Sequence, residues 1–244
     1  MAIAVSVRNV FKDYRLGRQV VAALRGVSLE IQEGEFTVIA GPSGSGKTTL
    51  LNIIGCMDVA TRGEVVVDGE AVSSLSDRRL TEFRLRKLGY VFQSFNLVPV
   101  LTVFQNIELP LLLQGGLSAR GRATRIQTLV DRVGLAAHVK HRPRELSGGQ
   151  QQRVAIARAL VTHPKLVLAD EPTANLDSVT GGQIIDLMRE MARAENTTFV
   201  FSTHDPRVMS MADRIVEVAD GRLYAERRDL VPGAGSLGPS APVA

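Results

Sequence analysis

The 244-residue chain is 45% hydrophobic and 22% charged, a balance typical of a globular protein with one large α/β domain or two small ones. No apolar run approaches the roughly 20 residues that cross a bilayer, the first residues lack the basic start of a secretory signal, and one cysteine excludes an internal disulfide. A net charge of only +4, with Phe83 the one aromatic residue inside the basic run 78–87, favours a solvated helix face over direct nucleic-acid binding.

The predicted strands are of two kinds. Apolar and polar residues alternate over 4–7 and 27–30, which predicts antiparallel strands with one solvated face, and Val65–Val67 before Asp68-Gly69 predicts another strand and a tight turn. Continuous apolar runs predict four strands buried on both faces: Thr37–Ala40, Leu88–Phe92, Leu166–Ala169 and Phe199–Phe201. Helical patterns lie between them, at Thr48–Met57, Arg120–Val133, Gln150–Val161 and Gly182–Ala194. This alternation indicates an α/β fold with a mostly parallel sheet.

The region from Phe95 to about Pro164 has no strand pattern, so we expect a helical subdomain at about 95–164. Ile215–Val218 and Leu223–Ala225 flank a turn and predict a closing hairpin. The last residues are rich in Gly, Pro, Ser and Ala and cannot bury enough apolar area to become ordered. We therefore expect one domain over residues 1–228 and a flexible tail over 229–244.

Residues 41–48, Gly-Pro-Ser-Gly-Ser-Gly-Lys-Thr, match the phosphate-loop pattern G-x-x-x-x-G-K-[ST], after a predicted strand and before a predicted helix. Glycines let backbone N–H groups curl around phosphate, and the helix N-terminus adds partial positive charge. We expect Lys47 to reach the β- and γ-phosphates of ATP and the Thr48 hydroxyl to bind Mg²⁺. The predicted nucleotide-binding residues here are Gly41, Ser43, Gly44, Ser45, Gly46, Lys47, Thr48 and Thr49.

Polar side chains follow three other buried strands. Asp170 and Glu171 come directly after one strand, Gln93 after another and His204 after a third. Because ligands of open α/β sheets bind outside the carboxyl ends of the strands, we expect these side chains beside the phosphate loop. Asp170 is expected to hold Mg²⁺ through water, and Glu171 to orient or deprotonate the attacking water.

Leu146–Gln150, Leu-Ser-Gly-Gly-Gln, forms a second Gly-rich helix start. One interpretation is an anion site built from Ser147 and the backbone amides that follow it. The other is an ordinary N-cap with flexible turn residues. Local sequence favours the N-cap, because a chain with a complete phosphate loop has no evident need of a second one.

Together these motifs resemble the ABC ATPase family. Five of them stand in the family's order: the phosphate loop, a Q-loop at Gln93, a signature motif at Leu146–Gln150, a D-loop at Asn175–Asp177 and a switch histidine at His204. The resemblance covers roughly residues 5–226 and implies a P-loop NTPase core with an antiparallel β-subdomain and an α-helical subdomain. It also implies catalytic roles for Glu171, His204 and Gln93.

The resemblance further implies a homodimer with ATP sandwiched between the copies. In that arrangement Ser147, Gly148, Gly149, Gln150 and Asp177 contribute to nucleotide binding. Gln93 would join Thr48 and Asp170 at Mg²⁺, and Tyr14 would stack on adenine, although a strand residue packed in a β-subdomain explains Tyr14 nearly as well.

The implied partner is a separate integral membrane permease, which would hold the chain on the cytoplasmic face of the membrane. Ser94–Gln114 is the expected docking surface, because it follows Gln93 and carries apolar residues that look exposed. Asn52–Asp58, Phe92–Leu97 and Leu146–Arg158 are similar to the lipoprotein-releasing and macrolide-export branch. The transported substrate is not readable from these residues.

Two other functions stay open. The ATP cycle could regulate a membrane partner without carrying anything across, since the nucleotide chemistry would be the same. A soluble ABC ATPase that acts on nucleic acid or ribosomes ranks lower, because such proteins resemble the family with a long coiled-coil insertion or two cassettes. This chain has one cassette and no sustained heptads.

Overall fold

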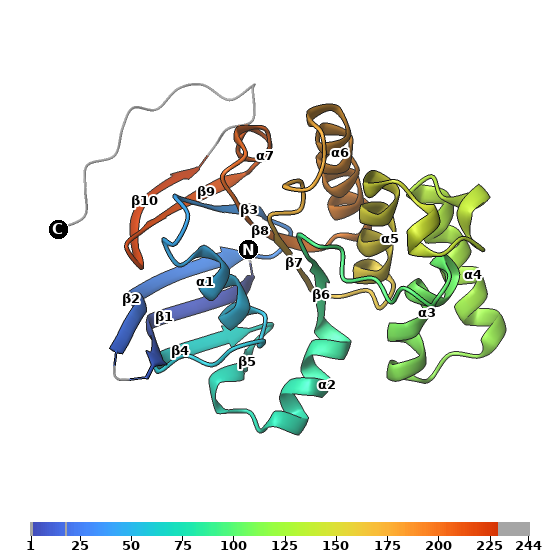
Figure 1. Cartoon of the computed structure of the whole chain (residues 1–244). Coiled ribbons are helices and arrows are strands. Elements are labelled where there is room, and N and C mark those ends of the chain that lie inside the picture. Colours follow the sequence, from blue (N-terminus) through green and yellow to red (C-terminus); the bar gives the residue numbers. More distant parts are fainter. Residues whose placement is uncertain (1, 18, 229–244) are drawn as a thin grey trace.

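The computed structural model describes residues 2–17 and 19–228 and contains two β-sheets (Figure 1). The tail expected over 229–244 lies outside these residues. Helices lie on both faces of the larger sheet, with α1 (Lys47–Ile54) on one face and α5 (Gly148–Leu160) and α6 (Ser178–Glu195) on the other. None of the described helices is both long and apolar enough to cross a membrane.

The smaller sheet is antiparallel, as the alternating pattern predicts. Its strand order is β2-β1-β4-β5, with bounds β1 (Ile3–Leu16), β2 (Gln19–Gln32), β4 (Arg62–Val67) and β5 (Glu70–Ala71). In β2 the buried residues Val27, Leu29 and Ile31 alternate with more exposed neighbours, as predicted. In β1 the predicted solvated face is not observed, because residues 4–7 are all buried. The buried apolar residues of both strands share one cluster with α1. The smaller sheet therefore packs against α1, the helix that follows the phosphate loop.

The larger sheet has the order β10-β9-β3-β8-β7-β6. Its strands are β3 (Phe36–Ala40), β6 (Leu88–Val91), β7 (Leu166–Asp170), β8 (Thr198–Thr203), β9 (Arg214–Ala219) and β10 (Arg222–Arg228). β6, β7, β8, β3 and β9 are parallel, and β10 closes the sheet as the antiparallel arm of the predicted hairpin. All residues of β3 and β8 are buried, which confirms the reading of continuous apolar runs as strands covered on both faces.

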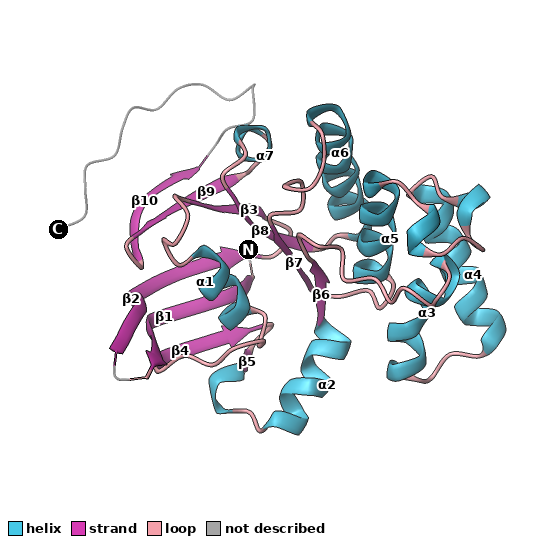
Figure 2. Ribbon diagram, viewed as in Figure 1, coloured by secondary structure: helices cyan, strands magenta, loops and turns pink. Residues whose placement is uncertain are grey.

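The remaining helices gather mostly at one end of the larger sheet, beyond β6 (Figure 2). They are α2 (Asp77–Lys87), α3 (Val103–Gln114), α4 (Ala119–Arg132) and α7 (Pro206–Ser210), with short 3₁₀ turns at Val72–Ser74, Ala136–His138 and Pro143–Glu145. No strand occurs between residues 95 and 164, as expected for a helical subdomain. The basic run 78–87 is α2, which buries only Leu80 and Phe83 and leaves most of its charges in solvent.

The four apolar residues expected to be exposed after Gln93 are only partly exposed, whereas Val100 in the same loop is 73% exposed. Phe95, Leu97, Val98 and Leu101 are half-buried, and Leu97 packs on the core of the helical region. The buried side chain of Asn106 explains this, because its oxygen accepts from the Val98 N–H and its nitrogen donates to nearby carbonyls of the same loop. These bonds fix the path of the loop, and Leu97 is the residue of the loop that packs on the core.

Candidate functional site

Segments that follow β3, β6, β7 and β8 meet at one cleft of about 640 Å³. They contribute the phosphate loop, Gln93, Glu171 and His204, and β2 contributes a wall at 21–23. The convergence expected from sequence is therefore present. Its cause is topological, because parallel strands end at the same edge of a sheet.

The phosphate loop begins at a position that requires glycine. Gly41 has φ +151°, and a Cβ atom there would lie 2.1 Å from the Val218 carbonyl oxygen. Lys47 is 8% exposed, and its Nζ donates to the carbonyl oxygens of Gly41 (2.9 Å) and Pro42 (3.0 Å). The buried Ser45 hydroxyl has no hydrogen-bond partner. The loop thus holds an ammonium group that an anionic ligand in the cleft could pair with, whereas Ser45 does not line the cleft.

Asp170 does not itself line the cleft, but its Oδ1 lies 3.1 Å from the hydroxyl of Thr48, which does. Ser202 also donates to Asp170 Oδ1, a contact that sequence reasoning missed. Ser202 is the β8 residue paired with Asp170 in the sheet, so only the order of the strands could have identified it. A hydroxyl and a carboxylate are hard oxygen donors of the kind that Mg²⁺ takes together with substrate phosphates.

Glu171 leaves the strand in a left-handed conformation, with φ 45°. Its Oε1 lies 2.9 Å from Nδ1 of His204, and its Oε2 accepts from the Thr203 hydroxyl at 3.3 Å. The Glu171 side chain is 18% exposed and that of His204 74% exposed. The carboxylate is therefore held from two sides while the imidazole remains in contact with solvent. Thr203 was not anticipated from the sequence.

Gln93 lines the cleft, and its carbonyl oxygen accepts from Asn175 Nδ2 at 3.0 Å. Asp177 caps α6 by accepting from the N–H groups of Val179 and Thr180, and hydrogen bonding from Thr180 lowers the pKa of its carboxyl group. Neither Asp177 nor Asn175 lines the cleft of its own chain. The predicted D-loop is thus tied to the Q-loop and follows directly after Ala174, which lines the cleft.

Asp205 links the loop after β8 to α6. It accepts from Arg207, which lowers the pKa of its carboxyl group, and from the Thr173 hydroxyl at 3.3 Å. Arg207 in turn donates to the Ser178 carbonyl oxygen in the first turn of α6. Sequence reasoning missed this pair, although Asp205 follows His204 directly.

Ser147 is the N-cap of α5, in a capping box with Gln150. The Ser147 hydroxyl accepts from the Gln150 N–H at 3.3 Å, and Gln150 Oε1 accepts from the Ser147 N–H at 2.9 Å. Ser147 is exposed, and the segment 147–150 does not line the cleft. The N-cap interpretation describes this chain on its own, and an outward-facing anion site remains compatible with it.

Tyr14 stands beside the cleft rather than in it. Its hydroxyl donates to Asp58 Oδ2 at 2.7 Å. Val21 is its partner in the β1–β2 hairpin, and Val21 lines the cleft. Residues paired across an antiparallel sheet project on the same side, so Tyr14 projects from the same side of the sheet as Val21.

Comparison with known proteins agrees with this geometry. The ABC transporter family profile matches residues 24–174. The chain is 50% identical over 226 residues to an ABC transporter ATP-binding protein of Thermotoga maritima, covering 92% of this chain and 96% of that protein. It is 46% identical over 222 residues to the lipoprotein-releasing system ATP-binding protein LolD of Anaeromyxobacter dehalogenans, covering 91% and 93%.

A solved structure extends the likeness to three dimensions. It is a dimeric post-hydrolysis state of the ATP-binding cassette MJ0796 bound to ADP and Pi, with a TM-score of 0.85 and 45% identity over 92% of this chain and 98% of that one. MJ0796 comes from Methanocaldococcus jannaschii. The predicted resemblance to the lipoprotein-releasing and macrolide-export branch is confirmed. The chain belongs to the ABC transporter family and is one of its ATP-hydrolysing cassettes.

Proposed function

We propose that two copies of this chain bind ATP and Mg²⁺ between them on the cytoplasmic face of a membrane and that ATP hydrolysis drives an attached permease. The observation that carries the proposal is the single cleft where the phosphate loop, Glu171 and His204 meet. The domain organisation expected from sequence, one ATPase domain over 1–228 with a helical subdomain, is part of the proposal.

The phosphate loop is the proposed site of the ATP phosphates. Lys47 Nζ, now on two loop carbonyls, would turn to the β- and γ-phosphates, where charge-assisted bonds are stronger. Backbone N–H groups and hydroxyls of the loop would hold the remaining oxygens: Ser43, Gly44, Ser45, Gly46, Thr48 and Thr49.

Thr48, Asp170 and Gln93 are the residues that would hold Mg²⁺, and the hydroxyl–carboxylate pair at 3.1 Å supports this. Bound Mg²⁺ supplies charge neutralisation on the phosphates. Ser202 holds the Asp170 carboxylate in place from the neighbouring strand.

Glu171 is the proposed general base toward the attacking water. His204 Nδ1 and the Thr203 hydroxyl each contact one oxygen of its carboxylate and so fix its orientation, and acceptor capacity is left for a water. His204 is exposed enough to contact the γ-phosphate at the mouth of the cleft. A contact that strengthens as charge develops there would accelerate hydrolysis.

The second copy supplies what one chain lacks. In their own chain Ser147 is exposed, Gly148 and Gln150 are half-buried, and none of the three lines the cleft. Gly149 is buried against Thr180 of α6. A two-fold arrangement would place each signature motif over the partner's γ-phosphate, with Asp177 at the same interface. The dimeric cassette structure supports this arrangement by its 45% identity to this chain.

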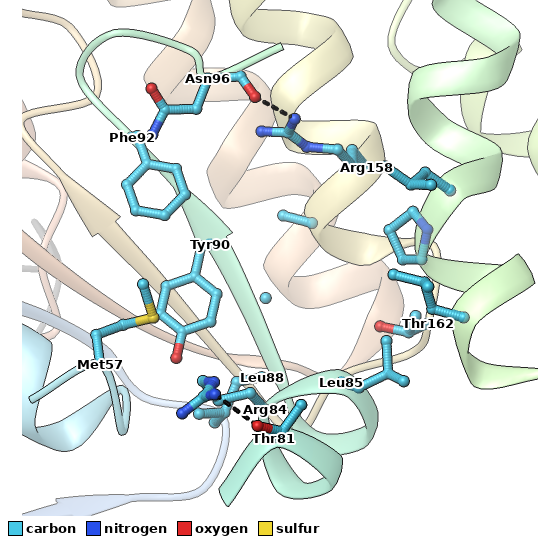
Figure 3. Close-up of a pocket in the computed structure, with 15 residues that line it drawn as sticks. Met57, Thr81, Arg84, Leu85, Leu88, Tyr90, Phe92, Asn96, Arg158 and Thr162 are labelled. Atoms are coloured by element: carbon cyan, nitrogen blue, oxygen red, sulfur yellow. Dashed lines mark hydrogen bonds between the residues drawn. The ribbon is translucent and has the colours of Figure 1, made fainter. Parts of the chain in front are cut away.

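A groove beside the cleft is the proposed docking site for the permease (Figure 3). It has a volume of about 380 Å³ and lies between the sheet edge and the helical region. Its walls come from α2, β6, the loop after β6, α3 and α5, and include Leu85, Tyr90, Phe92, Pro110, Leu113 and Arg158. The sequence-based choice of 94–114 covers two of these walls, the loop after β6 and α3.

The charge of the groove indicates what would fit it. Arg158 donates to the carbonyl oxygens of Phe95 and Asn96, and Arg84 donates to that of Cys56, so neither guanidinium pairs with a carboxylate within the described residues. The apolar walls suit a short amphipathic segment, and the two charges suit acidic residues on it. We assign that segment to a cytoplasmic part of the permease.

Dimer closure is the test of the proposed function. Glu171→Gln removes the base but keeps the shape of the side chain, so turnover should fall by about 10²-fold or more while ATP still binds. That variant should change from monomer to dimer when ATP is added, but not with ADP, because the γ-phosphate is the shared group. Light scattering with each nucleotide measures the change.

Adding Ser147→Arg to Glu171→Gln should abolish the ATP-dependent dimer and leave ATP binding to the monomer intact. Ser147 also caps α5, so the matched control is Ser118→Arg, which removes an equivalent cap from α4. Each substitution should cost about 1 kcal/mol of folding free energy, but only Ser147→Arg should prevent dimerisation. A Ser147→Arg variant that still dimerises contradicts the sandwich.

A further inference from the structure

The Tyr14 side chain is held by contacts that no nucleotide chemistry requires. Its hydroxyl donates to Asp58 Oδ2 at 2.7 Å, which ties the far end of the ring to the turn after α1. Burial and then the Asp58 hydrogen bond raise the pKa of the Tyr14 phenol. The ring is therefore a neutral phenol fixed at its far end.

Lys12 completes the arrangement from the same strand. Its Nζ lies 2.5 Å from Asp58 Oδ1 and 2.8 Å from the Val59 carbonyl oxygen, and it stands 4.9 Å from the centroid of the Tyr14 ring. The Lys12 side chain is 13% exposed and that of Asp58 27% exposed, so the pair is mostly shielded from solvent. The ammonium covers one face of the ring as a cation–π contact.

Asp58 is the centre of this cluster. Oδ1 accepts from Lys12 and from the Val59 N–H at 2.7 Å, and Oδ2 accepts from Tyr14. Burial alone would raise the pKa of its carboxyl group, but the hydrogen bonds from Lys12 and Tyr14 outweigh burial and lower it. Asp58 is thus ionised at neutral pH and holds both neighbours at once.

We propose that Asp58 is a positioning residue for the nucleotide base: with Lys12 it locks the Tyr14 ring so that its uncovered face meets adenine at the mouth of the cleft. The proposal rests on the proposed function, because Tyr14 faces a base only if the phosphate loop binds a nucleotide. Val21, paired with Tyr14 and 39% exposed, offers an apolar contact on the same side. A ring fixed before binding loses less conformational freedom when the base stacks.

Comparing two ligands distinguishes contacts to the base from contacts to the phosphates. ADP contains both a base and phosphates and is not consumed, whereas inorganic pyrophosphate can bind only to the phosphate loop. Asp58→Ala should weaken ADP binding about three- to tenfold, a part of the loss expected for a whole base stack. It should leave pyrophosphate binding within about twofold of wild type. Isothermal titration calorimetry measures both affinities.

A double-mutant cycle tests whether Asp58 affects ADP binding by way of the Tyr14 ring. Tyr14→Ala should weaken ADP about tenfold, and adding Asp58→Ala to it should weaken ADP by less than twofold more. Asp58→Asn should give a smaller loss than Asp58→Ala, because it keeps an acceptor for the phenol. The control is Glu64→Gln, which breaks an exposed ion pair with Arg8 in the same sheet and should change neither affinity.

The outcomes distinguish this inference from the proposed function. Lys47→Ala should weaken both ligands, and if it weakens neither, the phosphate-loop assignment fails. If Lys47→Ala weakens both ligands but Asp58→Ala weakens both equally or neither, the positioning role fails alone. Additive effects of Tyr14→Ala and Asp58→Ala would also overturn it, because Asp58 would then act without the ring.

Discussion

At the scale of single residues, Asp170 and Glu171 are neighbours in sequence with different surroundings. Asp170 is the last residue of β7 and takes its partners from two other elements, Thr48 in α1 and Ser202 in β8. Glu171 turns out of the strand at φ 45° and meets His204 instead. One backbone turn therefore separates a carboxylate suited to metal from a carboxylate suited to a water molecule.

Cys56 lies in the core beside α1 and allows a prediction about reactivity. Burial raises the pKa of its thiol to about 11, although the nearby Arg84 guanidinium acts in the opposite direction. At pH 8 the thiolate fraction should be about 10²-fold below that of an unperturbed thiol. Titration with a chromogenic disulfide reagent should therefore be slow in the native protein and fast in 6 M guanidinium chloride. Equal rates would contradict the buried position.

At the scale of elements, the contact between β6 and α5 depends on a missing side chain. A Cβ atom on Gly89 would lie 2.4 Å from the Ala159 carbonyl oxygen, which is backbone and cannot move alone. Gly89→Ala should therefore push α5 from the sheet edge and cost about 1–3 kcal/mol. Thermal unfolding should show a lower midpoint, by about 2–4 °C per kcal/mol.

The matched control is Gly182→Ala in α6, where an added Cβ meets no atom within 4 Å. Alanine is about 1 kcal/mol better than glycine inside a helix, so this variant should raise the midpoint slightly. If Gly89→Ala lowers the unfolding midpoint and Gly182→Ala raises it, the loss of stability at Gly89 comes from the close packing of α5 on β6. If both lowered the midpoint equally, β6 and α5 would not be in the close contact described.

At the scale of the whole molecule, the groove of Figure 3 joins the sheet edge to the helical region and predicts where a permease binds. Leu113 is 67% exposed and lines the groove. Leu113→Arg would replace an apolar contact by a third positive charge and should reduce the co-purifying permease at least tenfold. Basal ATP hydrolysis of the isolated chain should stay within about twofold of wild type.

The control for that experiment is Tyr224→Arg, which changes an equally exposed residue on β10, outside the groove. It should retain the permease and the stimulation of hydrolysis that the permease produces. Loss of the permease in both variants, or in neither, would argue against the groove as the docking site. The amount of co-purifying permease and its stimulation of hydrolysis are both measured on the tagged chain after purification from native membranes.

The sequence by itself determined the elements whose signals are local. Spacing predicted the phosphate loop, alternation predicted the antiparallel sheet, and continuous apolar runs predicted β3, β7 and β8, because each signal reflects a backbone shape or a burial pattern within a few residues. It also predicted that strand ends would meet, since parallel strands share one edge. The two interpretations of Ser147 could not be separated, because a cap and an anion site use the same residues.

Only the tertiary structure decided which distant residues touch. Ser202 reaches Asp170 because β8 pairs with β7, and Asp58 reaches Tyr14 because the turn after α1 returns to β1. The inward orientation of Leu97 depends on Asn106, which anchors its loop from α3. These contacts join segments far apart in the chain or depend on a loop's path, and no local spacing encodes either one.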